Sequence, residues 1–136
     1  MAREDFFCRL SALSKQLGID LQEVQLQQFY SYYTLLVEKN KVMNLTAITE
    51  EDDVIVKHFI DSLAMAKLNV SRETFSNWIE GKRCMDVGTG AGFPGLAIKI
   101  AFPSISLSLS DSLQKRIHFL EEVVQKLELK GVDFHH

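Results

Sequence analysis

The chain has 136 residues, of which 46% are hydrophobic and 24% are charged, and its formal net charge is −3. This apolar content, without tracts of Pro, Gly or Ser, excludes intrinsic disorder and is enough to bury a core. The acidic balance gives no electrostatic footprint for nucleic acid. The length predicts one ordinary domain, or a small domain joined to part of a larger one.

The N-terminus and the cysteines indicate a cytosolic protein. The opening residues MAREDFFCRL carry charges where a signal peptide needs an apolar run. No run of about 18 apolar residues occurs, so we expect no membrane partner and a cytoplasmic location. Cys8 and Cys84 lack the spacing of a zinc site, which predicts reduced thiols and no metal centre.

Two amphipathic helices are predicted at the start of the chain. The first has an apolar stripe at helical spacing, formed by Phe6, Leu10, Leu13 and Leu17. Gly18 ends it, and Asp20 with Glu23 predicts a capping box for a second helix that continues to about Glu38. The second helix has a stripe of Leu21, Val24, Gln28 and Tyr32. An aromatic cluster on this helix is either a base-stacking surface or, as we prefer at this spacing, core: Phe29, Tyr30, Tyr32 and Tyr33.

A third helix is predicted after an ordered connection over residues 39–48. Thr49 offers an N-cap oxygen, and acidic residues follow in the first turn. His58, Asp61 and Ser62 fall on one face and contain the residue types of a hydrolytic triad. Side chains on one helical face point outward together, and no glycine elbow presents the serine, so we reject that reading. We expect a packed histidine, hydrogen-bonded by a carboxylate, that ties this helix to the next domain.

The second half of the chain alternates strands and helices. After a link at 71–81, a buried strand over 83–87 leads into a glycine loop, and Pro103 stops the helix predicted over 93–101. Apolar residues 105, 107 and 109 alternate with serines, which predicts a strand with one thinly covered face.

An amphipathic helix over 113–127, ended by Gly131, and a strand from Val132 complete a β-loop-α-β-α-β order. This order predicts an α/β fold, the start of a doubly wound Rossmann-like sheet with right-handed crossovers. We expect a helical extension over 1–70 and the first half of the Rossmann-like domain over 71–136.

The glycine loop from Asp86 to Gly95 reads DVGTGAGFPG and gives the strongest functional signal. Gly88 permits a tight turn, and Gly90 lets a ligand approach the main chain. A dinucleotide site needs its third glycine where Phe93 stands, and a P-loop needs Lys and Ser or Thr after Gly95. The remaining pattern, acidic-x-G-x-G-x-G, is typical of class I S-adenosylmethionine methyltransferases.

Two carboxylates extend this hypothesis. Asp86 can attract the methionine ammonium of the cofactor, directly or through water. Asp111 ends the serine-alternating strand, where a carboxylate can accept hydrogen bonds from two ribose hydroxyls. The alternative for Asp111 is an N-cap for the helix at Leu113, although Ser112 can cap instead.

Four stretches in combination resemble the glucose-inhibited division protein B family, which are 16S ribosomal RNA guanine-N7 methyltransferases: KNKVMNLTAIT, VIVKHFIDSL, DVGTGAGFPGLAIKIAFP and SDSLQKRIHFLEEV. The resemblance covers nearly the whole chain. It implies a class I methyltransferase fold, S-adenosyl-L-methionine as cofactor and the small ribosomal subunit as partner. It also implies that Gly88, Gly90, Gly92 and Phe93 line the cofactor and that Asp111 lies near its ribose.

The candidate cofactor-binding residues are Asp86, Gly88, Thr89, Gly90, Gly92, Phe93, Asp111 and Ser112. No catalytic residue is assigned, because guanine N7 is already nucleophilic and its methylation depends on positioning rather than on a strong base.

Length sets the chain apart from the family it resembles. Similar members continue through strands that supply an acidic-Arg-Ala-Glu segment for adenine and basic residues for RNA, whereas this chain stops at His136. We therefore expect a cofactor half-site and an open apolar edge at Arg83 to Val87, which favours self-association. Two alternatives stay open: a non-catalytic remnant or binding module, and a methyltransferase with a non-RNA acceptor.

Overall fold

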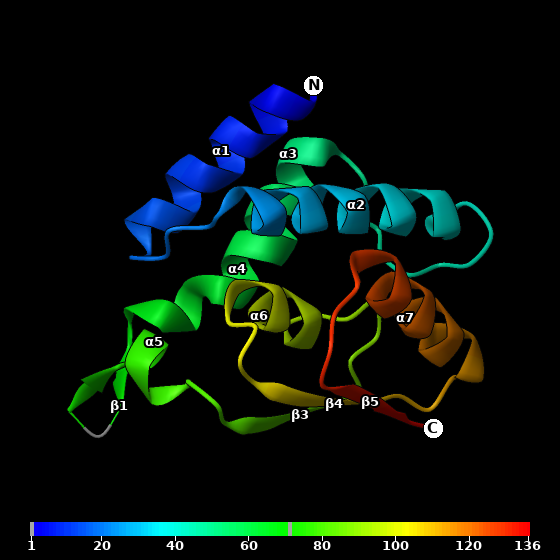
Figure 1. The fold of residues 1–136 in the computed structure, drawn as a ribbon. Helices are drawn as coiled ribbons and strands as arrows, with labels where there is room; N and C mark the ends of the chain where they lie inside the picture. The colour runs from blue at the N-terminus through cyan, green and yellow to red at the C-terminus, as the bar shows by residue number, and fades with distance from the viewer. Residues whose placement is uncertain (1, 71) are drawn as a thin grey trace.

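The computed structural model describes residues 2–70 and 72–136. It is layered, with a three-stranded parallel sheet at one side and helices stacked above it (Figure 1). Helices α6 (Gly95–Ala101) and α7 (Gln114–Leu127) lie directly on the sheet, and α2 (Glu23–Asn40) crosses both of them. Helix α1 (Arg3–Gln16) is the outermost layer. The predicted α/β order and helical N-terminus are confirmed.

The first two helices have the predicted positions but a different cap. Gly18, with φ +79°, ends α1 as expected. The capping box of α2 is formed by Gln22 and Gln25 rather than by Asp20 and Glu23, so the helix begins later than predicted. The Gln25 side chain is long enough to accept from the Gln22 N–H at 2.7 Å while its amide also reaches the last carbonyls of α6.

The aromatic cluster of α2 belongs to the core, as preferred. Phe29 and Tyr32 are fully buried with Phe6 and Phe59, and Tyr30 and Tyr33 pack against the same cluster. Burial of such large rings supplies much of the folding free energy of a domain of this size. The predicted stripe is wrong at Val24, which is 64% exposed.

A continuous helical run follows the connection, and its geometry changes along its length. It comprises α3 (Glu51–Asp53), a π-helix η1 (Val54–Ile60), α4 (Asp61–Leu63) and a 3-10 turn η2 (Ala64–Lys67). The N-cap is Glu50, without a side-chain bond, so the predicted cap at Thr49 is wrong. Thr46 rather than Thr49 supplies a hydroxyl to the local backbone, accepting from the Ile48 N–H at 3.0 Å.

The link between the halves contains short regular elements. Strands β1 (Asn69–Val70) and β2 (Glu73–Thr74) pair antiparallel, and α5 (Phe75–Trp78) follows. The Thr74 hydroxyl caps α5 by accepting from the Asn77 N–H.

Strands β3 (Arg83–Val87), β4 (Ser106–Ser110) and β5 (Val132–His135) pair in parallel in the order β3-β4-β5. The alternation of β4 is confirmed, because Leu107 and Leu109 are buried under the helices while its serines face the other side. Helix α7 ends at Leu127, and its C-cap residue Glu128 takes the left-handed conformation at φ +57°, before the predicted terminator Gly131.

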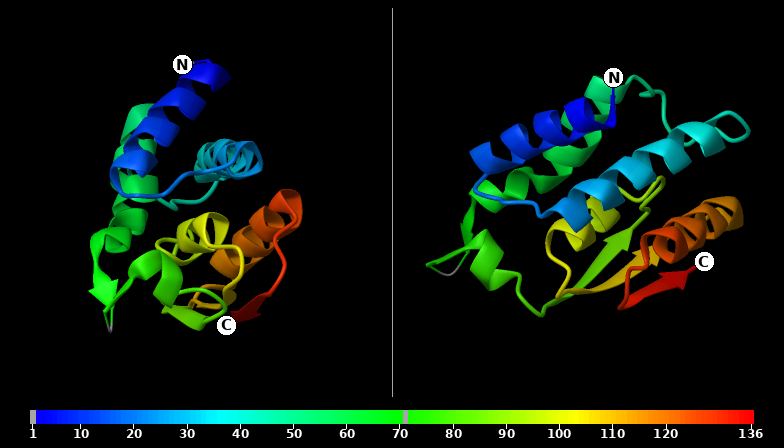
Figure 2. Two further views of the ribbon diagram at one scale, coloured as in Figure 1. Left: turned by 60° about the vertical axis from the view of Figure 1, so that its left-hand side comes forward. Right: turned by 45° about the horizontal axis from the view of Figure 1, so that its top comes forward.

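Within the described residues one face of the sheet is open, and β3 and β5 are its two edge strands. Helices α6 and α7 cover the upper face, and no helix lies beneath the sheet (Figures 1 and 2). Strand β3 is an edge strand, with Met85 62% exposed and Val87 73% exposed. The predicted apolar edge is therefore present. In residues 2–70 and 72–136 no helix is both long and apolar enough to cross a membrane.

Candidate functional site

The turn after β3 presents bare backbone. Gly88 and Gly90 have φ values of +69° and +60°, a region that favours glycine. A Cβ atom added to either residue would meet nothing within 4 Å, so both face open space. The N–H groups of Gly88 and Thr89 donate to the Ser110 carbonyl at 2.8 and 3.0 Å, which fixes the turn at the carboxyl ends of β3 and β4. Open backbone at this edge fits a nucleoside ligand.

Gly92 and Gly95, later in the loop, are required for a different reason, which is close packing. A Cβ on Gly92 would collide with the Tyr32 hydroxyl and approach two leucines of α6 and α7. A Cβ on Gly95 would lie 2.8 Å from a carboxylate oxygen of Asp86 and 2.9 Å from Leu109. Both residues are buried. Gly92 lets the loop approach helices α2, α6 and α7, and Gly95 lets the start of α6 approach strands β3 and β4, whereas Gly88 and Gly90 face open space.

Asp86 holds the two ends of the loop together. Its Oδ2 accepts a hydrogen bond from the Thr89 hydroxyl at 2.8 Å and another from the Gly95 N–H at 2.9 Å. Thr89 is only 3% exposed, so its side chain serves this contact. The carboxylate therefore satisfies the first turn of α6, where exposed N–H groups favour negative charge.

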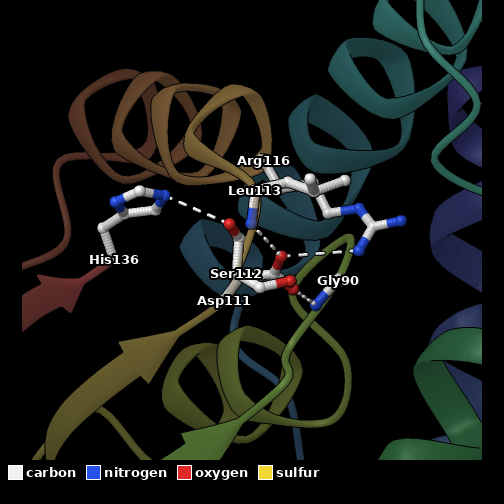
Figure 3. A network of polar contacts seen from close by, with 6 residues as sticks. All are labelled: Gly90, Asp111, Ser112, Leu113, Arg116 and His136. Carbon is white, nitrogen blue, oxygen red and sulfur yellow. Dashed lines mark hydrogen bonds and ion pairs between the residues drawn. The ribbon is translucent and has the colours of Figure 1, made fainter.

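Asp111 joins the loop to the start of α7 (Figure 3). One carboxylate oxygen accepts from the Gly90 N–H at 2.9 Å, and the other accepts from the Leu113 N–H at 3.0 Å and lies 3.4 Å from the Arg116 guanidinium. The carboxylate is 4% exposed. Burial raises the pKa of Asp111, but the hydrogen bonds from Leu113 and Gly90 and the charge of Arg116 outweigh it and hold the pKa below its usual value.

Neither Asp111 nor Ser112 is the N-cap of α7, and Asp111 forms a turn before the helix instead. Leu113 is the N-cap residue and makes no side-chain cap bond. Asp111 binds its N–H from two residues upstream, which is an Asx turn rather than an N-cap. Ser112 is exposed, and its carbonyl lies 3.1 Å from Nε2 of His136 (Figure 3).

Phe93 anchors the loop to the N-terminal helices. Its ring stacks on Tyr32 at 5.3 Å and on His58 at 4.3 Å, with interplanar angles of 17° and 5°. The Tyr32 hydroxyl donates to the Ala91 carbonyl at 2.5 Å. The prediction that His58 is packed and ties its helix to the next part of the chain is confirmed.

The predicted partner of His58 is wrong. Its Nε2 lies 2.8 Å from the Thr46 hydroxyl, whereas Asp61, one turn along, is exposed. The Ser62 hydroxyl donates to the His58 carbonyl, so no triad forms. Burial lowers the pKa of His58, and the charge of Asp61 offsets this in part. Sequence reasoning missed Tyr32 and Thr46 as site neighbours; the NLTAIT motif around Thr46 was the available signal.

A glycine turn after the first parallel strand and a carboxylate after the second, on a sheet flanked by helices, define the first half of a class I methyltransferase fold. The chain belongs to the GidB family, described as rRNA small subunit methyltransferase G, whose model matches residues 25–136.

Three curated relatives carry the name ribosomal RNA small subunit methyltransferase G. The relative from Lachnoclostridium phytofermentans is 50% identical, with 90% of this chain and 48% of the relative covered. The relative from Ligilactobacillus salivarius is 51% identical, with 88% of this chain and 47% of the relative covered. The relative from Leuconostoc mesenteroides is 47% identical, with 100% of this chain and 53% of the relative covered. The chain spans about half the length of these relatives.

Proposed function

We propose that this chain is the cofactor-binding half of a cytoplasmic S-adenosyl-L-methionine-dependent methyltransferase that modifies a guanine N7 in 16S ribosomal RNA. The observation that supports this most is the bare turn at Gly88 and Gly90, closed on Asp111, in a chain of this family. The names of the relatives support RNA of the small ribosomal subunit as the acceptor.

The residues around the turn suit such a ligand. Gly88 and Gly90 would let the nucleoside lie against the main chain. Asp111 is held charged by its neighbours. Its Oδ1 already accepts from Leu113 and Arg116, whereas its Oδ2 accepts from Gly90 and keeps a lone pair that can accept from a ribose hydroxyl. Asp86 would attract the methionine ammonium through its partly exposed carboxylate.

The other candidate residues shape the loop. Thr89 holds Asp86 in place, Gly92 allows α2 to approach, and Phe93 fixes the loop against the helices. Ser112 lies exposed beside Asp111, where it can border the cofactor.

The cofactor supplies an electrophilic methyl group on its sulfonium. Guanine N7 has a free lone pair, so the protein has to hold the base in line with that methyl group and exclude competing orientations. No residue of the chain is required as a general base. The role of the chain is therefore cofactor binding and orientation.

Titration calorimetry of the chain with S-adenosylmethionine tests the cofactor site, and Gly90→Ala is the informative variant. Its Cβ would enter the open space beside the turn, so binding should be lost. Gly18→Ala is the matched control, because Gly18 has a similar positive φ of +79°, equally open surroundings and a position far along the chain. Both variants should lose about 1–2 kcal/mol of stability, but only the first should lose affinity.

Two results would contradict this proposal. Unchanged affinity in Gly90→Ala would remove the ligand from the turn. Absence of heat from the parent chain, with the fold intact by circular dichroism, would favour the non-catalytic remnant.

The acceptor is tested by transfer of a labelled methyl group to small-subunit RNA that lacks the modification. The assay compares the 136-residue chain by itself with a longer protein that contains this chain and has the full length of its relatives. We expect label at a guanine N7 with the longer protein. Label on a protein or small molecule instead would support the non-RNA acceptor.

We also propose that the chain by itself associates through the β3 edge. The edge carries unpaired backbone and the exposed side chains of Met85 and Val87, beside a cavity of about 310 Å³ bordered by α5 and α6. Such edges pair readily with another strand. Sedimentation velocity across a concentration series should show oligomers that Met85→Lys reduces. A concentration-independent monomer would overturn this proposal.

A further inference from the structure

A second cavity lies on the helix side of the glycine loop. It has a volume of about 320 Å³, at the lower end of the range for ligand pockets. The helical run contributes Lys57, His58 and Asp61 to its lining, and the loop contributes Phe93 and Pro94. The same loop therefore borders this cavity through Phe93 and open space through Gly90.

The cavity has an aromatic platform. The rings of Tyr32, Phe93 and His58 form a continuous stack, in which Tyr32 is fully buried while Phe93 and His58 are partly exposed. The contact between His58 and Thr46 fixes the imidazole in this stack. Near-parallel rings that reach a cavity suit a planar heterocycle, because every nucleobase has a face that stacks on an aromatic ring.

The charged groups at the rim select among the bases. Asp61 is an exposed carboxylate, which when ionised only accepts hydrogen bonds. Guanine presents two adjacent donors on its Watson–Crick edge, the ring N–H and the amino group, whereas the other bases place an acceptor beside each donor. Lys57 has a side chain that is 59% exposed beside Asp53, where it can meet a phosphate.

We propose that this cavity receives the acceptor base as a guanine nucleotide, with its ring on the His58–Phe93 stack and its Watson–Crick edge on the Asp61 carboxylate. Unpaired bases are read in this way when they are taken out of a nucleic-acid stack. N7 lies on the side of the purine away from the amino group, so this grip leaves N7 unengaged. The inference rests on the proposed function and adds the residues that select the acceptor.

The experiment titrates guanosine monophosphate into the chain and follows binding by NMR chemical-shift changes. We expect shifts at His58 and Asp61, weaker binding of adenosine monophosphate, and no displacement by S-adenosylmethionine. Asp61→Asn should weaken guanosine monophosphate by roughly tenfold or more, because it removes a charged acceptor and adds a donor opposite donors. Asp20→Asn, the same change at an exposed site on another segment, should leave binding unchanged.

A second pair of variants tests the stack. His58→Ala should lose binding, and His58→Phe, which keeps a flat ring, should restore most of it even though the Thr46 bond is gone. Loss of fold alone would not produce that rescue.

Equal binding of both nucleotides, no binding of either, or an unchanged affinity in Asp61→Asn overturns the inference. Cofactor affinity separates it from the proposed function. A chain that binds S-adenosylmethionine normally but ignores guanosine monophosphate refutes only the acceptor site, and the reverse pattern refutes only the cofactor site.

Discussion

Tyr32→Phe tests how the N-terminal helices hold the glycine loop. The Tyr32 side chain is fully buried, and its hydroxyl donates to the Ala91 carbonyl within the loop. Burial, with the charge of Asp86, raises the pKa of this hydroxyl well above its usual value, so it stays protonated and acts as a donor. Phenylalanine keeps the stack on Phe93 but leaves the carbonyl without this partner. An unmatched buried acceptor costs about 1–3 kcal/mol, so we expect a loss of that size.

Urea denaturation followed by circular dichroism measures this loss, with stability obtained by linear extrapolation. Tyr30→Phe is the matched control, because it removes the same atom from a partly exposed ring two residues away. Its stability should stay within about 0.5 kcal/mol of the parent chain. Because the loop is released at Ala91, Tyr32→Phe should also weaken S-adenosylmethionine binding. Equal midpoints for the two variants would refute the idea that this bond anchors the loop.

Two further predictions concern packing and acid stability. Gly92→Ala should destabilise the chain by about 2–5 kcal/mol, through strain at φ +103° and collision with Tyr32, whereas Gly81→Ala has open surroundings and should cost about 1–2 kcal/mol in the same melts. Since the folded pKa of Asp111 is depressed, its contribution is present above the unfolded pKa and is lost as pH falls through the folded value. Asp111→Asn should therefore flatten the fall in stability measured below about pH 4; an unchanged slope would contradict the assignment.

Local sequence patterns predicted the ends of helices well where a glycine or a proline restricts the backbone conformation. Gly18 ends α1 and Pro103 follows α6, because positive φ and a missing N–H act without tertiary help. Caps were less predictable. Glu128 takes the left-handed position expected of Gly131, and Gln22 with Gln25 caps α2, because contacts with α6 favour that start.

The sequence by itself determined the family, the β-loop-α-β-α-β order and the position of the glycine turn. These depend on short spacings, which adjacent residues encode directly. Only the tertiary structure separated Gly88 and Gly90, which face open space, from Gly92, which makes room for Tyr32. Only the tertiary structure showed that His58 contacts both the Thr46 hydroxyl and the Phe93 ring. Such pairings join residues far apart in the chain, and many partners of similar chemistry compete for each position, so packing has to choose between them.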